Sequence, residues 1–161
     1  MRLTPFGEDV LPHERTMSKP KEERLALLRA CEVNLGPIFM LYRDEQHELE
    51  AAFEPIEKTA PLYRFKDERG EEHIVWRITD ERTLALASAV MANKRLYIAD
   101  GHHRYETALT RRNELAAQRG LDALPPGDPH NFCLGYLVNM EDREGVLILA
   151  AHRLLSGRHL D

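Results

Sequence analysis

Apolar residues repeat at helical spacing in the stretch that follows Pro20. The stripe consists of Leu25, Leu28, Cys31 and Leu35. Proline is favoured at the first helical position and Gly36-Pro37 stops a helix, so the pattern predicts a helix with both ends marked. A shorter helical pattern covers His47 to Phe53, and Pro55 is expected to end that helix.

Two further helices are predicted in the second half of the chain. Thr79 or Asp80 can cap the first of them, and Asn93 offers a left-handed residue at its C-terminal end. The second runs from about His102 to Gly120, a residue that readily reverses the chain. Apolar residues on one side of each helix indicate the face that packs on the core.

The strand patterns are of two kinds. Ile38 to Tyr42 is a continuous apolar run, which predicts a strand that is covered on both faces. Leu62 to Lys66 and Ile74 to Ile78 alternate apolar and polar positions on either side of Asp67 to Gly70, a pattern typical of a β-hairpin. Leu96 to Ala99 is a short strand that leads directly into the last predicted helix.

A second hairpin is predicted near the end of the chain. Its strands are Phe132 to Val138 and Val146 to Ala150, joined across Glu141 to Gly145. The predicted elements therefore interleave single helices with hairpins. This order predicts an α+β fold with a mixed sheet and helices, rather than a doubly wound parallel sheet.

The composition narrows the function classes. Lys and Arg number 22 and Asp and Glu number 27, so the formal net charge is −5, which argues against binding to nucleic acid or to an anionic membrane. The length predicts a single domain over residues 1–161. Cys31 and Cys133 lie in apolar contexts and are expected to be buried thiols. No apolar stretch matches a signal peptide or a membrane span, so a cytoplasmic protein is expected.

The main candidate site is the stretch Arg95 to Leu109, where a strand breaks at Asp100-Gly101 and a helix begins with His102-His103-Arg104. The first turn of a helix has backbone N–H groups without partners and the positive end of the helix dipole, so each cation there costs about 0.3–1 kcal/mol. A bound phosphate would remove this conflict. Gly101 allows close approach of the backbone, and the Arg104 guanidinium can clamp the oxygens. A solvated arginine on the helix surface is the alternative.

The neighbouring side chains each have two interpretations. His102 and His103 point about 100° apart on a helix, which favours hydrogen bonds to a phosphate over a shared zinc ion. Packed or surface histidines are the alternative. Asp100 either caps the helix or binds Mg²⁺ and accepts a proton from a hydroxyl nucleophile.

A second group of candidates lies outside this stretch. Glu14, in Leu11-Pro-His-Glu-Arg-Thr16, is a candidate general base, with local capping and pairing as the alternative. His152-Arg153 is a candidate for the same site or a solvated strand end. Trp76 and Tyr105 are expected in the core or at the rim of a site rather than in a base-stacking platform.

Asp100-Gly-His-His-Arg-Tyr-Glu-Thr-Ala108 resembles the signature of domain-of-unknown-function family 1015, a widespread prokaryotic family. Leu11 to Thr16, the Leu62 to Ile78 hairpin and Leu137-Val-Asn-Met140 also resemble that family. The resemblance covers about Val10 to Leu155. Members of the family are usually longer on both sides, so the resemblance implies that this chain is a central fragment of a longer protein.

That family is in turn similar to the ParB/sulfiredoxin superfamily, whose members bind nucleotide phosphates through a Gly-x-x-Arg turn at a helix start. Gly101 to Arg104 matches this turn. His102 stands where sulfiredoxin-like proteins have a reactive cysteine, so thiol chemistry is not expected. The archaeal ADP-dependent free serine kinases share the string from Asp100 to Arg104. Their similarity implies a nucleotide, ADP or ATP, together with Mg²⁺ near Asp100.

Three hypotheses for function follow. The first is a nucleotide-dependent phosphotransferase, a small-molecule kinase, whose partners are a nucleotide and a small hydroxyl-bearing substrate. Its phosphates would bind at Gly101, His102, His103 and Arg104, its catalytic candidates are Asp100 and Glu14, and its metal ligand is Asp100. The second is a nucleotide- or phosphate-sensing module without catalysis. The third is a metal site built on Asp100, His102 and His103.

Overall fold

The computed structural model describes residues 1–7 and 9–149 and has an α+β fold. Its elements are β1 (Val10–Leu11), α1 (Ser18–Cys31), β2 (Ile38–Tyr42), α2 (Glu48–Glu57), β3 (Tyr63–Lys66), β4 (Glu72–Val75), α3 (Glu81–Met91), β5 (Leu96–Asp100), α4 (His102–Gln118), the 3-10 helix η1 (Pro129–Asn131) and β6 (Gly135–Asn139). From α1 to α4 the elements follow the predicted order. Within the described residues, no helix has both the length and the apolar composition that crossing a bilayer requires.

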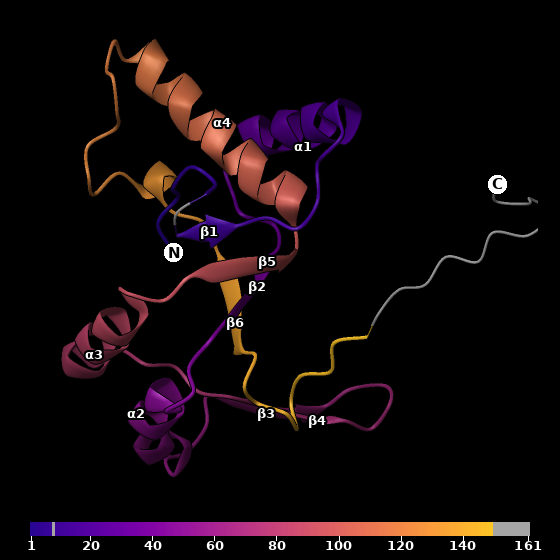
Figure 1. The fold of residues 1–161 in the computed structure, drawn as a ribbon, viewed down its shortest axis with the longest axis vertical. Helices are drawn as coiled ribbons and strands as arrows, with labels where there is room; N and C mark the ends of the chain where they lie inside the picture. Colours follow the sequence, from indigo (N-terminus) through magenta and orange to yellow (C-terminus); the bar gives the residue numbers. More distant parts are fainter. Residues whose placement is uncertain (8, 150–161) are drawn as a thin grey trace, which may run out of the picture.

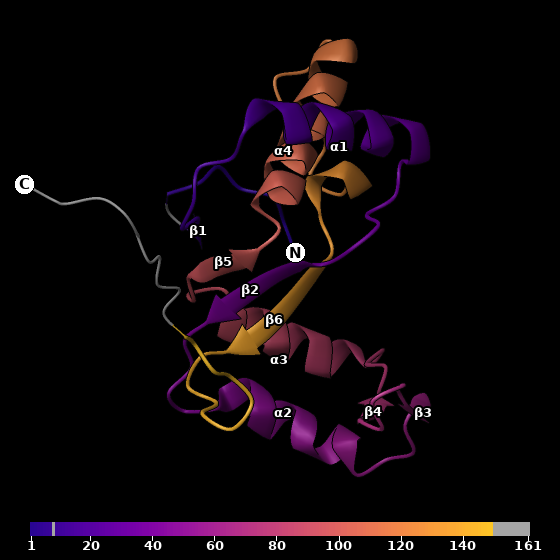
Figure 2. The same ribbon diagram turned by 90° about the vertical axis from the view of Figure 1, so that its right-hand side faces the viewer.

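Four strands form a mixed sheet in the order β1-β5-β2-β6. β2 lies inside the sheet, antiparallel to β5 and parallel to β6, and β1 is parallel to β5. The predicted mixed sheet is therefore confirmed. In both ribbon views α1 and α4 lie at one end of the molecule and α2, α3 and the β3–β4 hairpin at the other, with the four-stranded sheet between them (Figures 1 and 2).

The core lies between the sheet and α4. Along β2, Ile38 and Met40 are buried while Phe39 and Leu41 are partly exposed, which follows the two-residue period of a strand. The buried side chains join a cluster that includes Leu3, Val10, Ile98, Tyr105, Ala108 and Cys133. The alternate residues of β2 face the other side of the sheet, so this strand is fully buried on one face only.

Tyr105 of α4 holds the N-terminal segment against the core. Its side chain is fully buried, as expected for a core residue. Its hydroxyl donates a hydrogen bond to the carbonyl oxygen of Thr4 at 2.8 Å and accepts one from the Thr4 N–H at 3.0 Å. Phe6 stacks on the tyrosine ring with 5.2 Å between the ring centroids.

A buried carboxylate connects the sheet to α2. Asp44 is 1% exposed and accepts hydrogen bonds from the backbone N–H groups of Glu48 and Leu49 at 2.8 and 3.4 Å. Lys94 Nζ lies 2.9 Å from its Oδ1. Burial alone raises the pKa of Asp44, but the lysine and the two N–H donors outweigh burial and hold the pKa below its ordinary value.

The first predicted hairpin and one predicted cap are confirmed. β3 and β4 pair antiparallel, with Tyr63 opposite Val75, so the second strand ends three residues before the expected Ile78. Asp80 caps α3, because its carboxylate accepts a hydrogen bond from the Thr83 N–H at 2.8 Å.

The second predicted hairpin is wrong. β6 pairs with β2 in parallel, with Ile38 opposite Gly135, and residues 146–149 form no strand. Ala150 lies outside the described residues. The two segments on either side of residues 141–145 predicted a local pairing, whereas β6 pairs with a strand almost a hundred positions earlier in the sequence.

Four smaller predictions are also wrong. α1 ends at Cys31, so Gly36-Pro37 does not stop the helix and Leu35 lies beyond it. α2 continues past Pro55 to Glu57, and the proline lies in the last turn of the helix. Ala92 follows α3 in a right-handed conformation, and Asn93 has no positive φ. Cys31 is exposed at the final residue of α1, whereas Cys133 is buried as expected.

Candidate functional site

The junction of β5 and α4 is built around Gly101. This residue has φ 97° and forms the N-cap of α4, with no side chain capping the helix. Asp100 is therefore the last residue of β5 and not the cap that one interpretation expected. Among the described residues, the backbone N–H groups of residues 102–104 donate to no other protein group. The first turn of α4 thus presents unpaired donors at the positive end of the helix dipole.

Arg104 lies directly against Gly101. Its Nη2 donates to Asp100 Oδ2 at 2.8 Å. A Cβ at position 101 would lie 2.8 Å from the same Nη2, and one at Gly36 would lie 3.9 Å from Nη1. Within the described residues, Nε of Arg104 is buried and has no hydrogen-bond partner. The guanidinium therefore passes between two glycines and still has donor capacity for an anion.

The segment of residues 13–17 lies across the first turn of α4. His102 Nε2 accepts a hydrogen bond from the His13 N–H at 3.2 Å, and His103 Nε2 accepts one from the Met17 N–H at 3.3 Å. Thr16 Oγ1 donates to Glu106 at 2.5 Å. Both histidines thus hold this segment in place instead of pointing freely at an anion.

Glu106 completes this attachment from the second turn of α4. Lys21 Nζ lies 2.9 Å from its carboxylate. Burial alone raises the pKa of Glu106, but the hydrogen bonds from Thr16 and Lys21 outweigh burial and lower it. A charged Glu106 is therefore the form that these two residues stabilise.

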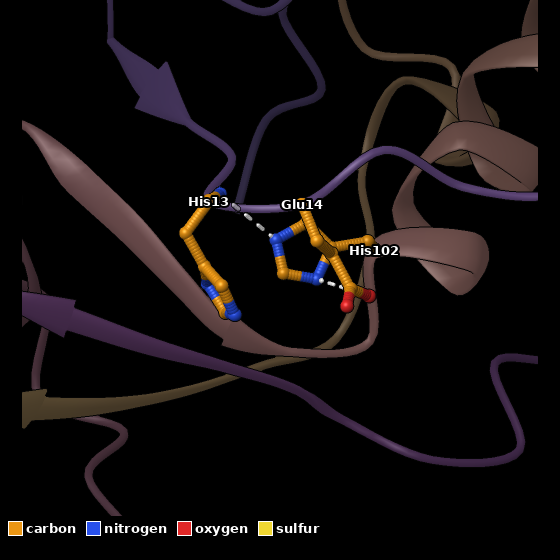
Figure 3. A group of neighbouring side chains, drawn as sticks. All are labelled: His13, Glu14 and His102. Atoms are coloured by element: carbon orange, nitrogen blue, oxygen red, sulfur yellow. Dashed lines mark hydrogen bonds and ion pairs between the residues drawn. The ribbon is translucent and has the colours of Figure 1, made fainter. Parts of the chain in front are cut away.

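His102 and Glu14 form a close pair, which Figure 3 shows beside His13. His102 Nδ1 lies 3.2 Å from Glu14 Oε1, and the imidazole is 1% exposed. Because Nε2 accepts a backbone N–H, the proton of the neutral ring lies on Nδ1, the nitrogen that faces Glu14. Burial, and then the neighbouring His13, lower the pKa of His102. The neutral imidazole thus places its Nδ1 beside the carboxylate of Glu14.

Three carboxylates surround the His102 imidazole. Glu14, Asp100 and Glu106 each act on it electrostatically and partly oppose the lowering of its pKa. The side chains of Glu14 and Asp100 are 51% and 75% exposed. The structure therefore brings both predicted catalytic candidates to the α4 start with their carboxylates open to solvent.

His13, Glu14 and His102 also have the composition of a metal site. One ligand atom from each lies within 4.8 Å of the others. His13 Nδ1 donates to the Ile98 carbonyl oxygen at 2.7 Å, which leaves its Nε2 as a ligand. His102 has no free lone pair, because Nε2 accepts a backbone N–H and Nδ1 carries the proton. A metal here would require the bond from the His13 N–H to break, so the arrangement fits a hydrogen-bonded pair better than a metal centre.

The other predicted residues have separate places. Within the described residues, Asp100, His102 and His103 form no metal-binding group. His152-Arg153 lies outside the described residues. His13 was not singled out from the sequence, although it stands beside Glu14 in the Leu11 to Thr16 motif.

The model of a family described as "Protein of unknown function (DUF1015)" matches residues 1–161. The chain belongs to this family. No curated protein and no solved structure matches it. In this DUF1015 chain, the signature from Asp100 to Ala108 contains the end of β5, the Gly101 cap and the first two turns of α4.

Proposed function

We propose that this chain is a nucleotide-dependent phosphotransferase, a small-molecule kinase that binds phosphates at the first turn of α4. One observation carries the proposal. The first turn of α4 has no side-chain cap, contains Arg104, and has two solvent-exposed carboxylates, Glu14 and Asp100, near its side chains. Phosphoryl transfer requires this combination of anion binding, metal binding and a proton acceptor, and positioning and charge neutralisation supply most of its catalysis.

The phosphate oxygens would meet the N–H groups of residues 102–104 and the guanidinium of Arg104. Gly101 supports this role, because any side chain there would displace the guanidinium. Arg104 donates to Asp100 through Nη2, and because its unpartnered Nε is buried, Nη1 is the nitrogen that remains for a phosphate. The histidines would contribute mainly by fixing the turn, since both Nε2 atoms accept backbone N–H groups.

The implied cofactor, Mg²⁺, fits the residues that are present. Magnesium prefers oxygen ligands and retains several waters, and the exposed carboxylate of Asp100 at the edge of the turn offers such a ligand. Bound magnesium neutralises the charge of the phosphates. ADP or ATP as the nucleotide follows from the resemblance to serine kinases.

Glu14 is the proposed general base. His102 Nδ1 lies 3.2 Å from its carboxylate, and half of the side chain is exposed to an incoming substrate. In the proposed step, the hydroxyl oxygen of the substrate forms a bond to the terminal phosphorus while the bond from phosphorus to the bridging oxygen breaks. The hydroxyl proton passes to Glu14, and the nucleotide leaves with one phosphate fewer.

Binding is tested by calorimetry and thermal stabilisation with ADP and ATP in the presence of Mg²⁺. Arg104→Ala is expected to weaken binding at least tenfold, because charge-assisted hydrogen bonds to a phosphate contribute about 1.5–3 kcal/mol. Arg82→Ala is the matched control, since Arg82 lies in the first turn of α3, which Asp80 already caps. Equal affinities in wild type and Arg104→Ala would refute the phosphate site.

Turnover is tested separately with nucleotide labelled in its terminal phosphate and a panel of small hydroxyl compounds that includes serine. Glu14→Gln is expected to retain nucleotide affinity and to lose transfer, because the amide has nearly the shape of the carboxylate but cannot accept the hydroxyl proton. Transfer by Glu14→Gln at the wild-type rate would exclude Glu14 as the base.

A sensor without catalysis is the second candidate function. Residues 13–17 are attached to the same turn that would bind the anion, so an anion bound there would act directly on this segment. Nucleotide binding in the absence of any labelled product would favour the sensor.

A further inference from the structure

The face of the sheet that turns away from α4 carries aromatic rings close to Asp100. Phe39 and Tyr136 are register partners in the parallel pair of β2 and β6, and their ring centroids lie 5.4 Å apart. Tyr136 is 58% exposed, and Tyr97 of β5 is exposed as well. Because successive residues of a strand alternate between faces, these rings lie opposite the buried residues Ile38, Met40 and Ile98.

These rings line a pocket that reaches the candidate site. Its lining includes Phe39, Tyr97, Ala99, Tyr136 and Val138 from the sheet and His13 from the segment before α1. His13 thus belongs both to the pocket and to the cluster with Glu14 and His102. Phe39 is also the register partner of Asp100, and Cα atoms of such antiparallel partners are about 4.5–5.5 Å apart. The aromatic pocket therefore lies next to the strand end that carries Asp100, the residue proposed to bind Mg²⁺.

We propose that this pocket binds the base of the nucleotide, an inference that rests on the proposed phosphotransferase function. A nucleobase is planar and stacks on exposed aromatic rings without requiring specific polar partners. His13 adds a polar contact at the edge of the pocket, because its Nδ1 is bonded to Ile98 and its Nε2 has no partner among the described residues.

Continuity with the α4 turn favours a nucleotide over an unrelated apolar partner. A single nucleotide has a charged end, which suits the N–H groups and Arg104, and a planar end, which suits Phe39 and Tyr136. The two regions share His13 and adjoin where Phe39 pairs with Asp100, so we expect one molecule to reach both. A purely apolar ligand would leave the polar half of this continuous surface unused.

Binding of adenosine, pyrophosphate and ADP to the same protein separates the two regions. Tyr136→Ala and Phe39→Leu are each expected to weaken binding of adenosine and of ADP with Mg²⁺ about tenfold, since stacking of one base on an aromatic side chain has that order of effect. Affinity for pyrophosphate with Mg²⁺ is expected to stay unchanged. Tyr63→Ala removes an exposed tyrosine from the separate hairpin and serves as the control.

The outcomes distinguish the base pocket from the phosphate site. Unchanged ADP affinity in Tyr136→Ala would overturn the base pocket and leave the phosphotransferase proposal intact. Binding of adenosine that depends on Tyr136, without any binding of pyrophosphate, would support the pocket and overturn the phosphate site. Weaker pyrophosphate binding in both variants, or no binding of any of the three compounds to wild type, would overturn the pocket. Far-UV circular dichroism verifies that each variant is folded.

Discussion

Replacement of Gly101 by alanine tests the central geometry of the site. Gly101 has φ 97°, and an L side chain in the left-handed region costs about 1–2 kcal/mol. The new Cβ would also lie 2.8 Å from Nη2 and 3.0 Å from Nε of Arg104. The guanidinium must therefore move away, which breaks its ion pair with Asp100.

The expected loss of stability combines the backbone cost at position 101 with the loss of the ion pair. The ion pair between Arg104 and Asp100 is largely exposed and contributes at most about 1 kcal/mol. Gly101→Ala is therefore expected to lower the free energy of unfolding by about 1–3 kcal/mol. Gly120→Ala is the matched control, because Gly120 has φ 67° and no atom within 4 Å of its added Cβ. The control incurs the backbone cost of about 1–2 kcal/mol alone.

Urea denaturation followed by circular dichroism measures both variants, and ADP titration measures the site. We expect similar losses of stability in the two variants, but an ADP affinity at least tenfold lower only in Gly101→Ala, because only there is Arg104 displaced. In the Arg104→Ala background, Gly101→Ala should show the backbone cost alone. The reasoning is refuted if Gly101→Ala is as stable as wild type or binds ADP equally well.

Three further predictions concern stability. The pKa of His102 is lowered in the folded protein, so the unfolded chain binds more protons than the folded chain below about pH 6.5. The urea concentration at the midpoint of unfolding should therefore decrease as the pH is lowered from about 7 to about 5. The decrease should be less steep in His102→Gln. Lys94→Met should lower the free energy of unfolding by about 3 kcal/mol, because it leaves the buried Asp44 without its cation. The control Lys58→Met, at an exposed ion pair, should have little effect. Equal urea midpoints for the two variants would contradict the role of Lys94. Tyr105→Phe should lower the free energy of unfolding by about 1–2 kcal/mol in the same assay, because it leaves the backbone N–H and carbonyl of Thr4 without the tyrosine hydroxyl. A stability equal to that of wild type would exclude a stabilising role for this hydroxyl.

The sequence by itself determined the elements whose signals are local. Apolar spacing, Asp80 and the break at Asp100-Gly101 predicted where helices begin, although α1 begins two residues before the expected Pro20. The apolar run from Ile38 to Tyr42 predicted β2 with its observed bounds. The sequence also showed the unfavourable position of Arg104 in the first turn of α4, because the start of a helix and the charges in its first turn are neighbours in the sequence.

Only the tertiary structure decided which distant segments meet. β6 pairs with β2 rather than with residues 146–149, since strand pairing depends on the whole sheet and not on adjacent residues. The bonds from the backbone of His13 and Met17 to the two histidines join residues almost ninety positions apart. The bond from His13 places the proton of the neutral His102 ring on Nδ1, the nitrogen that faces Glu14. Ring protonation of this kind depends on hydrogen-bond partners in space, which spacing along a single chain does not specify.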